Sequence, residues 1–159
     1  VGRLLTDARW GSATILPKRS ISRMTGTMSA PDGAALRSPF TILVSDDDPA
    51  VRRSLQMMLC AYGYTVQSYT SGWALLADPC ATAADCLVID YRMPDVDGVT
   101  VLQGLRAHGW RGKAILVSAY CDCALEAKAR AAGFDDLIAK PFIARAVREA
   151  IGSYKRPDS

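Results

Sequence analysis

The chain has 159 residues, half of them hydrophobic, which suits one packed domain and leaves little room for a second. No apolar run reaches the roughly 18 to 20 residues of a membrane span, and no secretory signal is evident, so we expect a cytoplasmic protein without a membrane partner. The net charge of +3 comes from residues 1–39, with six Lys or Arg against two Asp or Glu, because residues 40–159 hold 13 against 14. A folded part without a basic field is not expected to bind DNA directly.

Residues 1–39 differ from the rest of the chain in composition. They are rich in Ser, Thr, Gly, Pro and Arg and show no sustained apolar period of 2 or 3.6, which predicts a disordered N-terminal extension. The chain starts with Val, and Met28 stands shortly before the first predicted strand. We therefore hypothesise that residues 1–27 come from a start assigned upstream of the natural one.

From residue 41 onward, short β-branched runs alternate with longer amphipathic runs. This alternation predicts an α/β fold, with a doubly wound, five-stranded parallel sheet and helices on both faces, of the flavodoxin-like type. The predicted domain covers 40–155 and leaves a C-terminal tail at 156–159. The expected strands are 41–45, 64–69, 86–90, 113–118 and 136–139, and the expected helices are 49–62, 71–78, 98–109, 122–132 and 142–155.

Local signals bound the first predicted helix and bear on the cysteines. Asp48 is a suitable N-cap before Pro49, and Gly63 ends the helix.

Cys60 shares this helix with apolar residues and is expected to fill the core. The five cysteines are odd in number and irregular in spacing, so reduced thiols are expected, including Cys121 and Cys123, which lack further ligands for a metal.

Charged and hydroxyl side chains follow the predicted strands. Asp46 and Asp47 follow the first strand, and Asp90 ends the third. The carboxyl ends of parallel strands share one edge of a sheet, where three carboxylates would repel unless they shared a hard cation, which predicts a Mg²⁺ site. Mg²⁺ commonly completes its coordination with phosphate oxygens, to which Ser118 and Lys140, at the ends of the fourth and fifth strands, could donate.

These strand ends resemble the receiver domain of bacterial two-component response regulators, over about residues 40–155. The family pattern is an acidic pair after the first strand, a phosphoacceptor Asp before the motif MPxxDG, a Ser or Thr after the fourth strand and a Lys-Pro after the fifth. In this chain the matching residues are Asp46-Asp47, Asp90 in DYRMPDVDG, Ser118 and Lys140-Pro141.

The resemblance implies that Asp90 attacks a phosphohistidine of a histidine kinase or phosphotransfer protein and becomes an aspartyl phosphate in a Mg²⁺-dependent reaction. The metal ligands would be Asp46, Asp47, Asp90 and the backbone carbonyl of Arg92. Lys140 would pair with Asp90 before phosphorylation and with the phosphoryl group afterwards.

The resemblance also implies a cis peptide bond before Pro141. We expect a single-domain response regulator, a monomer or weak homodimer, that acts through an unknown downstream protein. It would be a phosphorelay signalling domain, with at most self-catalysed phosphorylation and dephosphorylation, and not an ordinary enzyme.

The sequence departs from the family pattern at one switch position. The family couples its Ser or Thr, here Ser118, to an aromatic residue three positions before the Lys, and in this chain that position is Leu137. Arg92 and Tyr120, two residues after Asp90 and Ser118, have bulk that could shield an acyl phosphate from water. Slow self-hydrolysis is therefore expected.

Other functions remain open from the residues alone. A phosphorylation-independent scaffold with the receiver fold is compatible with Leu137. A Mg²⁺-dependent phosphatase would usually need a second carboxylic acid just beyond the nucleophile, where this chain has Tyr91-Arg92. A nucleotide-binding protein would need a Gly-rich loop after the first strand, where acids stand instead.

Overall fold

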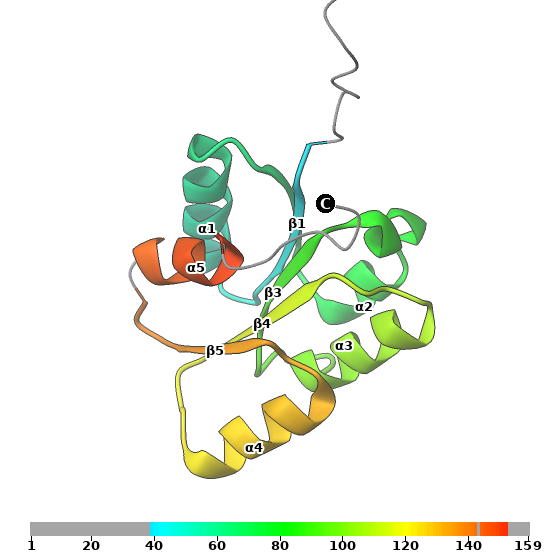
Figure 1. Ribbon diagram of the computed structural model, residues 1–159, viewed down its shortest axis with the longest axis vertical. Helices are drawn as coiled ribbons and strands as arrows, with labels where there is room; N and C mark the ends of the chain where they lie inside the picture. The colour runs from blue at the N-terminus through cyan, green and yellow to red at the C-terminus, as the bar shows by residue number, and fades with distance from the viewer. Residues whose placement is uncertain (1–38, 143, 153–159) are drawn as a thin grey trace, which may run out of the picture. The chain divides into compact units, whose positions relative to one another are not determined.

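The sheet has five parallel strands in the order β2-β1-β3-β4-β5, which confirms the predicted fold class (Figure 1). The computed structural model describes residues 39–142 and 144–152. The predicted disordered extension, 1–39, lies outside the described residues except for Pro39, and so does the predicted tail, 156–159. The strands are β1 (Thr41–Ser45), β2 (Thr65–Tyr69), β3 (Cys86–Asp90), β4 (Lys113–Ser118) and β5 (Asp136–Ala139).

The helices alternate with the strands along the chain. A short 3₁₀ helix, η1, follows α2 and was not predicted; the Asp78 side chain caps it by accepting from the Cys80 N–H at 2.8 Å. The predicted last helix, 142–155, contains α5, and its residues 143 and 153–155 lie outside the described residues. The elements are α1 (Pro49–Ala61), α2 (Gly72–Leu76), η1 (Pro79–Ala83), α3 (Gly98–Ala107), α4 (Cys123–Ala132) and α5 (Ala144–Gly152).

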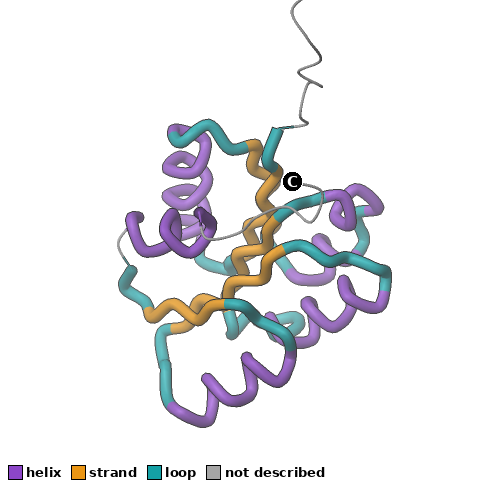
Figure 2. Tube along the Cα trace, viewed as in Figure 1, coloured by secondary structure: helices purple, strands orange, loops and turns teal. Residues whose placement is uncertain are grey.

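Two apolar clusters cover the two faces of the sheet, because successive strand residues point to opposite faces. Helices α1 and α5 lie on one face and α2, α3 and α4 on the other (Figures 1 and 2). All residues of β3 and β4 are buried, as expected for central strands of a parallel sheet covered on both sides. The central strands therefore hold their carboxyl ends in fixed positions.

Aspartates begin the helices that follow the strand ends. The Asp48 side chain accepts from the Ala50 N–H at 2.8 Å, which confirms it as the N-cap of α1. Asp97 caps α3 and Asp122 caps α4 in the same way, each accepting a backbone N–H at 2.7 Å. These caps satisfy otherwise unpaired N–H groups and fix the path of each loop from strand to helix.

Two side chains lie in environments that the sequence did not predict. Cys60 is exposed, so its expected place in the core is wrong: the buried stripe of α1 consists of Leu55 and Leu59. Lys113 is buried, pairs with Asp136 at 2.8 Å and donates to the Ala150 carbonyl of α5 at 2.6 Å. This lysine ties α5 to the sheet.

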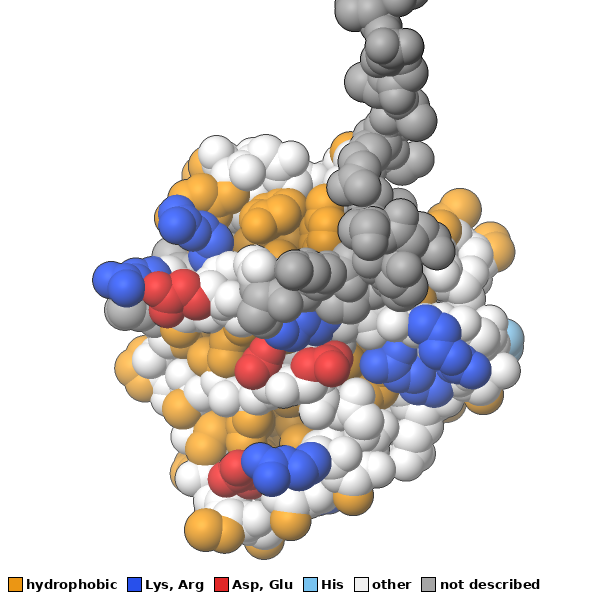
Figure 3. All heavy atoms as spheres, in the orientation of Figure 1, with side chains coloured by type: hydrophobic (Ala, Val, Ile, Leu, Met, Phe, Trp, Pro, Cys, Tyr) orange, Lys and Arg blue, Asp and Glu red, His pale blue; other side chains and the backbone are white. Residues whose placement is uncertain are grey.

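Charges of both signs are interspersed on the face of the molecule that Figure 3 displays. Arg106, in the last turn of α3, and Arg111, after the helix, both donate to the backbone carbonyl of Trp110. The Arg106 guanidinium also stacks on the Trp110 ring, 4.6 Å from its centre. Among the described helices, none is both long and apolar enough to cross a membrane.

Candidate functional site

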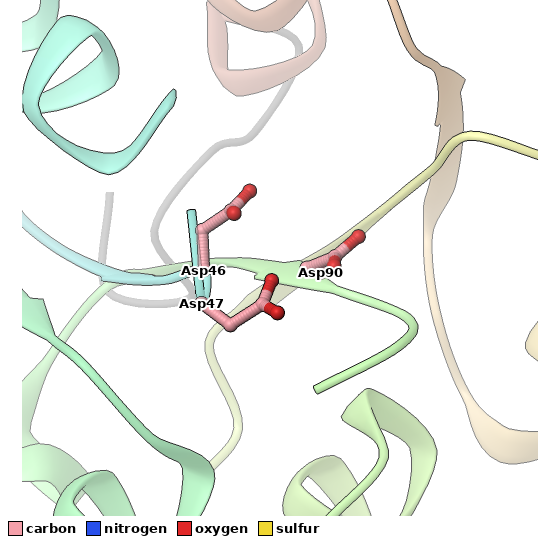
Figure 4. Close-up of side chains that lie close together, drawn as sticks. All are labelled: Asp46, Asp47 and Asp90. Atoms are coloured by element: carbon pink, nitrogen blue, oxygen red, sulfur yellow. The ribbon is translucent and has the colours of Figure 1, made fainter. Parts of the chain in front are cut away.

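Three carboxylates meet at the carboxyl edge of the sheet (Figure 4). Asp46 and Asp47 follow β1 directly, and Asp90 is the last residue of the neighbouring strand β3. One oxygen from each carboxylate lies within 4.8 Å of the other two. Asp46 and Asp90 are buried and Asp47 is exposed, so the cluster opens to solvent on the side of Asp47. Carboxylate oxygens so placed form a suitable donor set for a hard divalent cation.

The backbone around the acids is held by short contacts. The Arg52 guanidinium donates to the Asp46 carbonyl oxygen at 2.8 Å, and the Asp48 N–H donates to the Asp46 carboxylate at 3.0 Å. A Cβ atom added to Gly98 would lie 2.6 Å from the carbonyl oxygen of Asp90. The glycine of the DG motif therefore allows the start of α3 to approach the backbone of Asp90 closely.

Lys140 lies between the two buried acids. Its ammonium is 2.8 Å from Asp46 and 3.2 Å from Asp90, and its peptide bond to Pro141 is cis, as predicted. Burial by itself would lower the pKa of Lys140, but the hydrogen bond and charge of Asp46, helped by Asp90, raise the pKa. The Lys140 side chain is therefore protonated and positively charged in this pocket.

The pKa of Asp90 is raised, chiefly because burial removes the carboxylate from water. The charge and hydrogen bond of Lys140 oppose this shift, and the nearby charges of Asp46 and Asp47 add to it. A divalent cation shared by the three acids would act in the direction of Lys140 and keep Asp90 ionised. The carboxylate set thus has an excess of negative charge that one lysine does not neutralise.

Ser118 is buried at the end of β4, at the same edge of the sheet as the three acids. Its hydroxyl donates to the carbonyl oxygen of Tyr120 at 2.8 Å and accepts from the Tyr120 N–H at 3.1 Å. The hydroxyl is therefore engaged with the loop that leads into α4. Leu137, on β5, is half-buried and packs against the core on the side of α2, α3 and α4.

A family model for the response regulator receiver domain matches residues 42–152. The chain belongs to the receiver domain family. Receiver domains are signalling domains of two-component phosphorelays, accept a phosphoryl group from histidine kinases and bind Mg²⁺ at an acidic pocket. The resemblance inferred from the strand ends is thus confirmed.

Several known proteins are similar to this receiver. The transcriptional regulatory protein KdpE of Mycobacterium tuberculosis is 36% identical over 102 residues, which cover 64% of this chain and 44% of KdpE. The transcriptional regulatory protein FixJ of Azorhizobium caulinodans is 36% identical over 113 residues, covering 69% of this chain and 54% of FixJ. The matches thus span about half the length of these relatives. The solved structure of the Vibrio cholerae chemotaxis protein CheY4 has the same fold, with a TM-score of 0.69 and 19% identity over 72% of this chain and 98% of that one.

Two residues singled out in the sequence, Arg92 and Tyr120, lie on the loops that follow β3 and β4. The Arg92 guanidinium lies 5.6 Å from the centre of the Tyr120 ring, and the Tyr120 side chain is exposed. The stacked pair links the loop after β3 to the loop after β4. Its position is compatible with the predicted shielding, which stays a prediction, as does the metal contact of the Arg92 carbonyl.

Two contacts near the site escaped the sequence reasoning. The Lys128 ammonium of α4 donates to the Tyr91 hydroxyl at 3.1 Å, and it lies 3.7 Å from the carboxylate of Asp97. Asp97 could have been identified as an N-cap, because it precedes the glycine that opens α3. No spacing in the sequence pairs Lys128 with Tyr91, since 37 residues separate them.

Proposed function

We propose that this receiver takes up a phosphoryl group on Asp90 from a histidine kinase or a histidine phosphotransfer protein, with Mg²⁺ as cofactor. The observation that carries the proposal is the position of Lys140, within 3.2 Å of Asp90 and 2.8 Å of Asp46, beside carboxylate oxygens that lie within 4.8 Å of one another. In this proposal, the nucleophile Asp90, the ammonium of Lys140 and the metal site of the three acids lie together at one edge of the sheet.

The metal ligands in this proposal are Asp46, Asp47, Asp90 and the backbone carbonyl of Arg92. The cation would offset the negative charge that gathers as a phosphoryl group approaches three carboxylates. A carboxylate oxygen of Asp90 attacks phosphorus and the bond from phosphorus to the donor imidazole breaks; the imidazole, which carries a proton on its other ring nitrogen, leaves as neutral histidine.

Lys140 and Ser118 serve the transferred group in this proposal. The Lys140 ammonium already lies beside Asp90 and needs only a small movement to donate to a phosphoryl oxygen. The Ser118 hydroxyl carries one proton, so donating it to the phosphoryl group requires it to leave the Tyr120 carbonyl. Phosphorylation would thus change the conformation of the loop after β4. Leu137 is the neighbouring switch position.

We further propose that residues 40–155 act as the signalling unit and that output passes through binding of a downstream protein. Charges of opposite sign nearly balance in residues 40–159, which supports a protein partner over nucleic acid. The relatives KdpE and FixJ are named transcriptional regulators, and the matches cover only about half of each. Single-domain action by this chain is therefore part of the proposal.

The test is phosphorylation of the purified chain by acetyl phosphate with and without Mg²⁺, followed by intact mass. The expected result is one phosphate-sized, Mg²⁺-dependent gain that is absent from Asp90→Asn and present in Asp95→Asn, a control at an exposed acid of the same loop. No gain on folded protein would overturn the proposal in favour of the phosphorylation-independent scaffold. Steady hydrolysis of p-nitrophenyl phosphate through Asp90 would favour a phosphatase.

A further inference from the structure

Two cation–aromatic pairs tie helix α4 and its preceding loop to the loop that follows Asp90. The Lys128 ammonium, on α4, lies 5.1 Å from the centre of the Tyr91 ring, and the Arg92 guanidinium lies 5.6 Å from the Tyr120 ring. In one pair the cation comes from α4, and in the other it comes from the loop after β3. All four side chains line a single cavity of about 240 Å³.

Lys128 makes the larger number of polar contacts in this arrangement. Its ammonium donates to the Tyr91 hydroxyl at 3.1 Å and pairs with the Asp97 carboxylate at 3.7 Å. Asp97 is the N-cap of α3, and Tyr91 directly follows Asp90. One lysine of α4 therefore contacts both ends of the loop that joins the phosphoacceptor strand to α3. We call Lys128, Tyr91 and Asp97 the α4 clamp.

Tyr91 is a rigid partner for this lysine. Its N–H donates to the Val117 carbonyl at 2.8 Å, and its own carbonyl accepts from the Gly98 N–H at 3.1 Å. Its ring is partly buried and packs against the core on the α4 side of the sheet. Because the backbone of Tyr91 is held on both sides, the clamp fixes α4 relative to Asp90.

A second tether acts on the loop that precedes α4, whereas Lys128 lies in the middle of the helix. The Ser118 hydroxyl bonds to both backbone groups of Tyr120, and only Cys121 separates Tyr120 from Asp122, the N-cap of α4. If Ser118 turns its proton toward a phosphoryl group on Asp90, the Tyr120 carbonyl loses its donor, and one of the two bonds that hold the loop is lost. The clamp and the Arg92–Tyr120 pair then carry more of the hold on α4 and its preceding loop.

We propose that Lys128 is a positioning residue that holds α4 against the loop after Asp90, and that the strength of this hold limits how far α4 responds when Asp90 is phosphorylated. The proposal rests on the proposed phosphorylation of Asp90. Both tethers favour the same position of α4, so removing either one shifts the helix toward the position that it takes after phosphorylation. The clamp thereby sets how strongly α4 responds.

The experiment measures hydrogen exchange of peptides covering residues 121–133 in the full chain, with Mg²⁺ alone and with Mg²⁺ and beryllofluoride, a mimic of the aspartyl phosphate. In the unmodified protein, beryllofluoride should raise exchange in this segment by roughly threefold to tenfold. Lys128→Met should show raised exchange already without beryllofluoride, and a smaller further rise. Tyr91→Phe keeps the ring but loses the hydroxyl, and should lie between the two.

Two further variants separate positioning from a general effect on the helix. Lys128→Arg keeps a cation over the Tyr91 ring and should restore the response of the unmodified protein. Arg130→Met removes a cation of the same helix that is paired with Glu126 at an exposed site, and should leave the response unchanged. Equal responses in Lys128→Met and the unmodified protein would overturn the proposal, as would an equal loss in Arg130→Met.

The outcome is distinguishable from failure of the proposed function. Binding of beryllofluoride is followed separately by fluorine NMR of the bound group. If no bound group appears in the unmodified protein, the phosphorylation proposal fails. If it appears in the unmodified protein and in Lys128→Met while exchange of α4 stays the same in both, only the clamp is overturned.

Discussion

The backbone N–H of Lys140 donates to the carbonyl oxygen of Ser118 at 2.7 Å. This bond continues the pairing of β4 with β5, in which Ser118 lies opposite Ala139. It places the Lys140 side chain over the acids, because its ammonium reaches Asp46 and Asp90 from there. The hydroxyl and the ammonium proposed to serve the phosphoryl group are thus fixed to each other through the backbone.

Replacement of Lys140 by Met should weaken both phosphorylation and stability. Two buried carboxylates would lose their cation, so we expect the phosphorylation rate to fall at least about tenfold and the free energy of unfolding to fall by about 1–3 kcal/mol without Mg²⁺. Urea unfolding and intact mass measure the two effects. The control Arg145→Met breaks an exposed pair with Glu149 and should cost under about 0.5 kcal/mol. Equal effects of the two substitutions would contradict the assigned role of Lys140.

Mg²⁺ should stabilise the folded protein through the acid cluster. At ten times its dissociation constant, we expect the cation to raise the free energy of unfolding by about 1.4 kcal/mol, and EDTA to reverse the gain. Asp47→Asn should remove most of this gain. Asp48→Asn is the matched control, because Asn caps a helix as well as Asp does and Asp48 already serves as the cap of α1. A Mg²⁺ effect that survives Asp47→Asn and Asp46→Asn would place the cation elsewhere.

The stacked pair of Arg92 and Tyr120 should slow hydrolysis of the aspartyl phosphate. Replacing both by Ala opens the mouth of the site to water, so we expect the phosphorylated form to decay about threefold to tenfold faster. The decay of the phosphate-sized mass gain measures this rate. Arg106→Ala removes a guanidinium stacked on Trp110, away from the acid cluster, and should leave the decay unchanged. A decay rate unaffected by the double substitution would remove shielding as an explanation.

The hydroxyl of Tyr69 should make stability depend on pH in the acid range. It donates to Asp78 at 2.7 Å, and this bond is the main reason that the pKa of Asp78 is lowered. A lowered pKa in the folded state stabilises the protein above the unfolded pKa of about 4, and the contribution is lost as pH falls through the folded value.

Tyr69→Phe should therefore be less stable than the unmodified protein at neutral pH, and the difference should shrink as pH falls below the unfolded pKa of about 4. Urea unfolding across this range tests the prediction. Tyr62→Phe, at an exposed ring stacked with Arg148, is the control and should keep the slope of the unmodified protein. A constant difference between Tyr69→Phe and the unmodified protein at every pH would show that the hydrogen bond does not act through Asp78.

The sequence by itself determined the order and type of the main elements. Short β-branched runs, Pro49 at a helix start and Gly63 with its positive φ after α1 are local signals, and each acts within a few residues. The gathering of Asp46, Asp90 and Lys140 also followed, because parallel strands place their carboxyl ends at one edge. These inferences need only the hydrophobic periodicity of the sequence and the direction of the predicted strands.

The tertiary structure alone decided which side chains meet. Lys140 lies nearer to Asp46 than to Asp90, Ser118 points its hydroxyl at the backbone of Tyr120, and Lys128 reaches Tyr91 across 37 residues. Likewise, the exposure of Cys60 depends on how α1 turns its face toward the sheet. Such contacts are set by helix rotation and loop path, where a few ångströms separate a hydrogen bond from none, and hydrophobic periodicity carries no information at that scale.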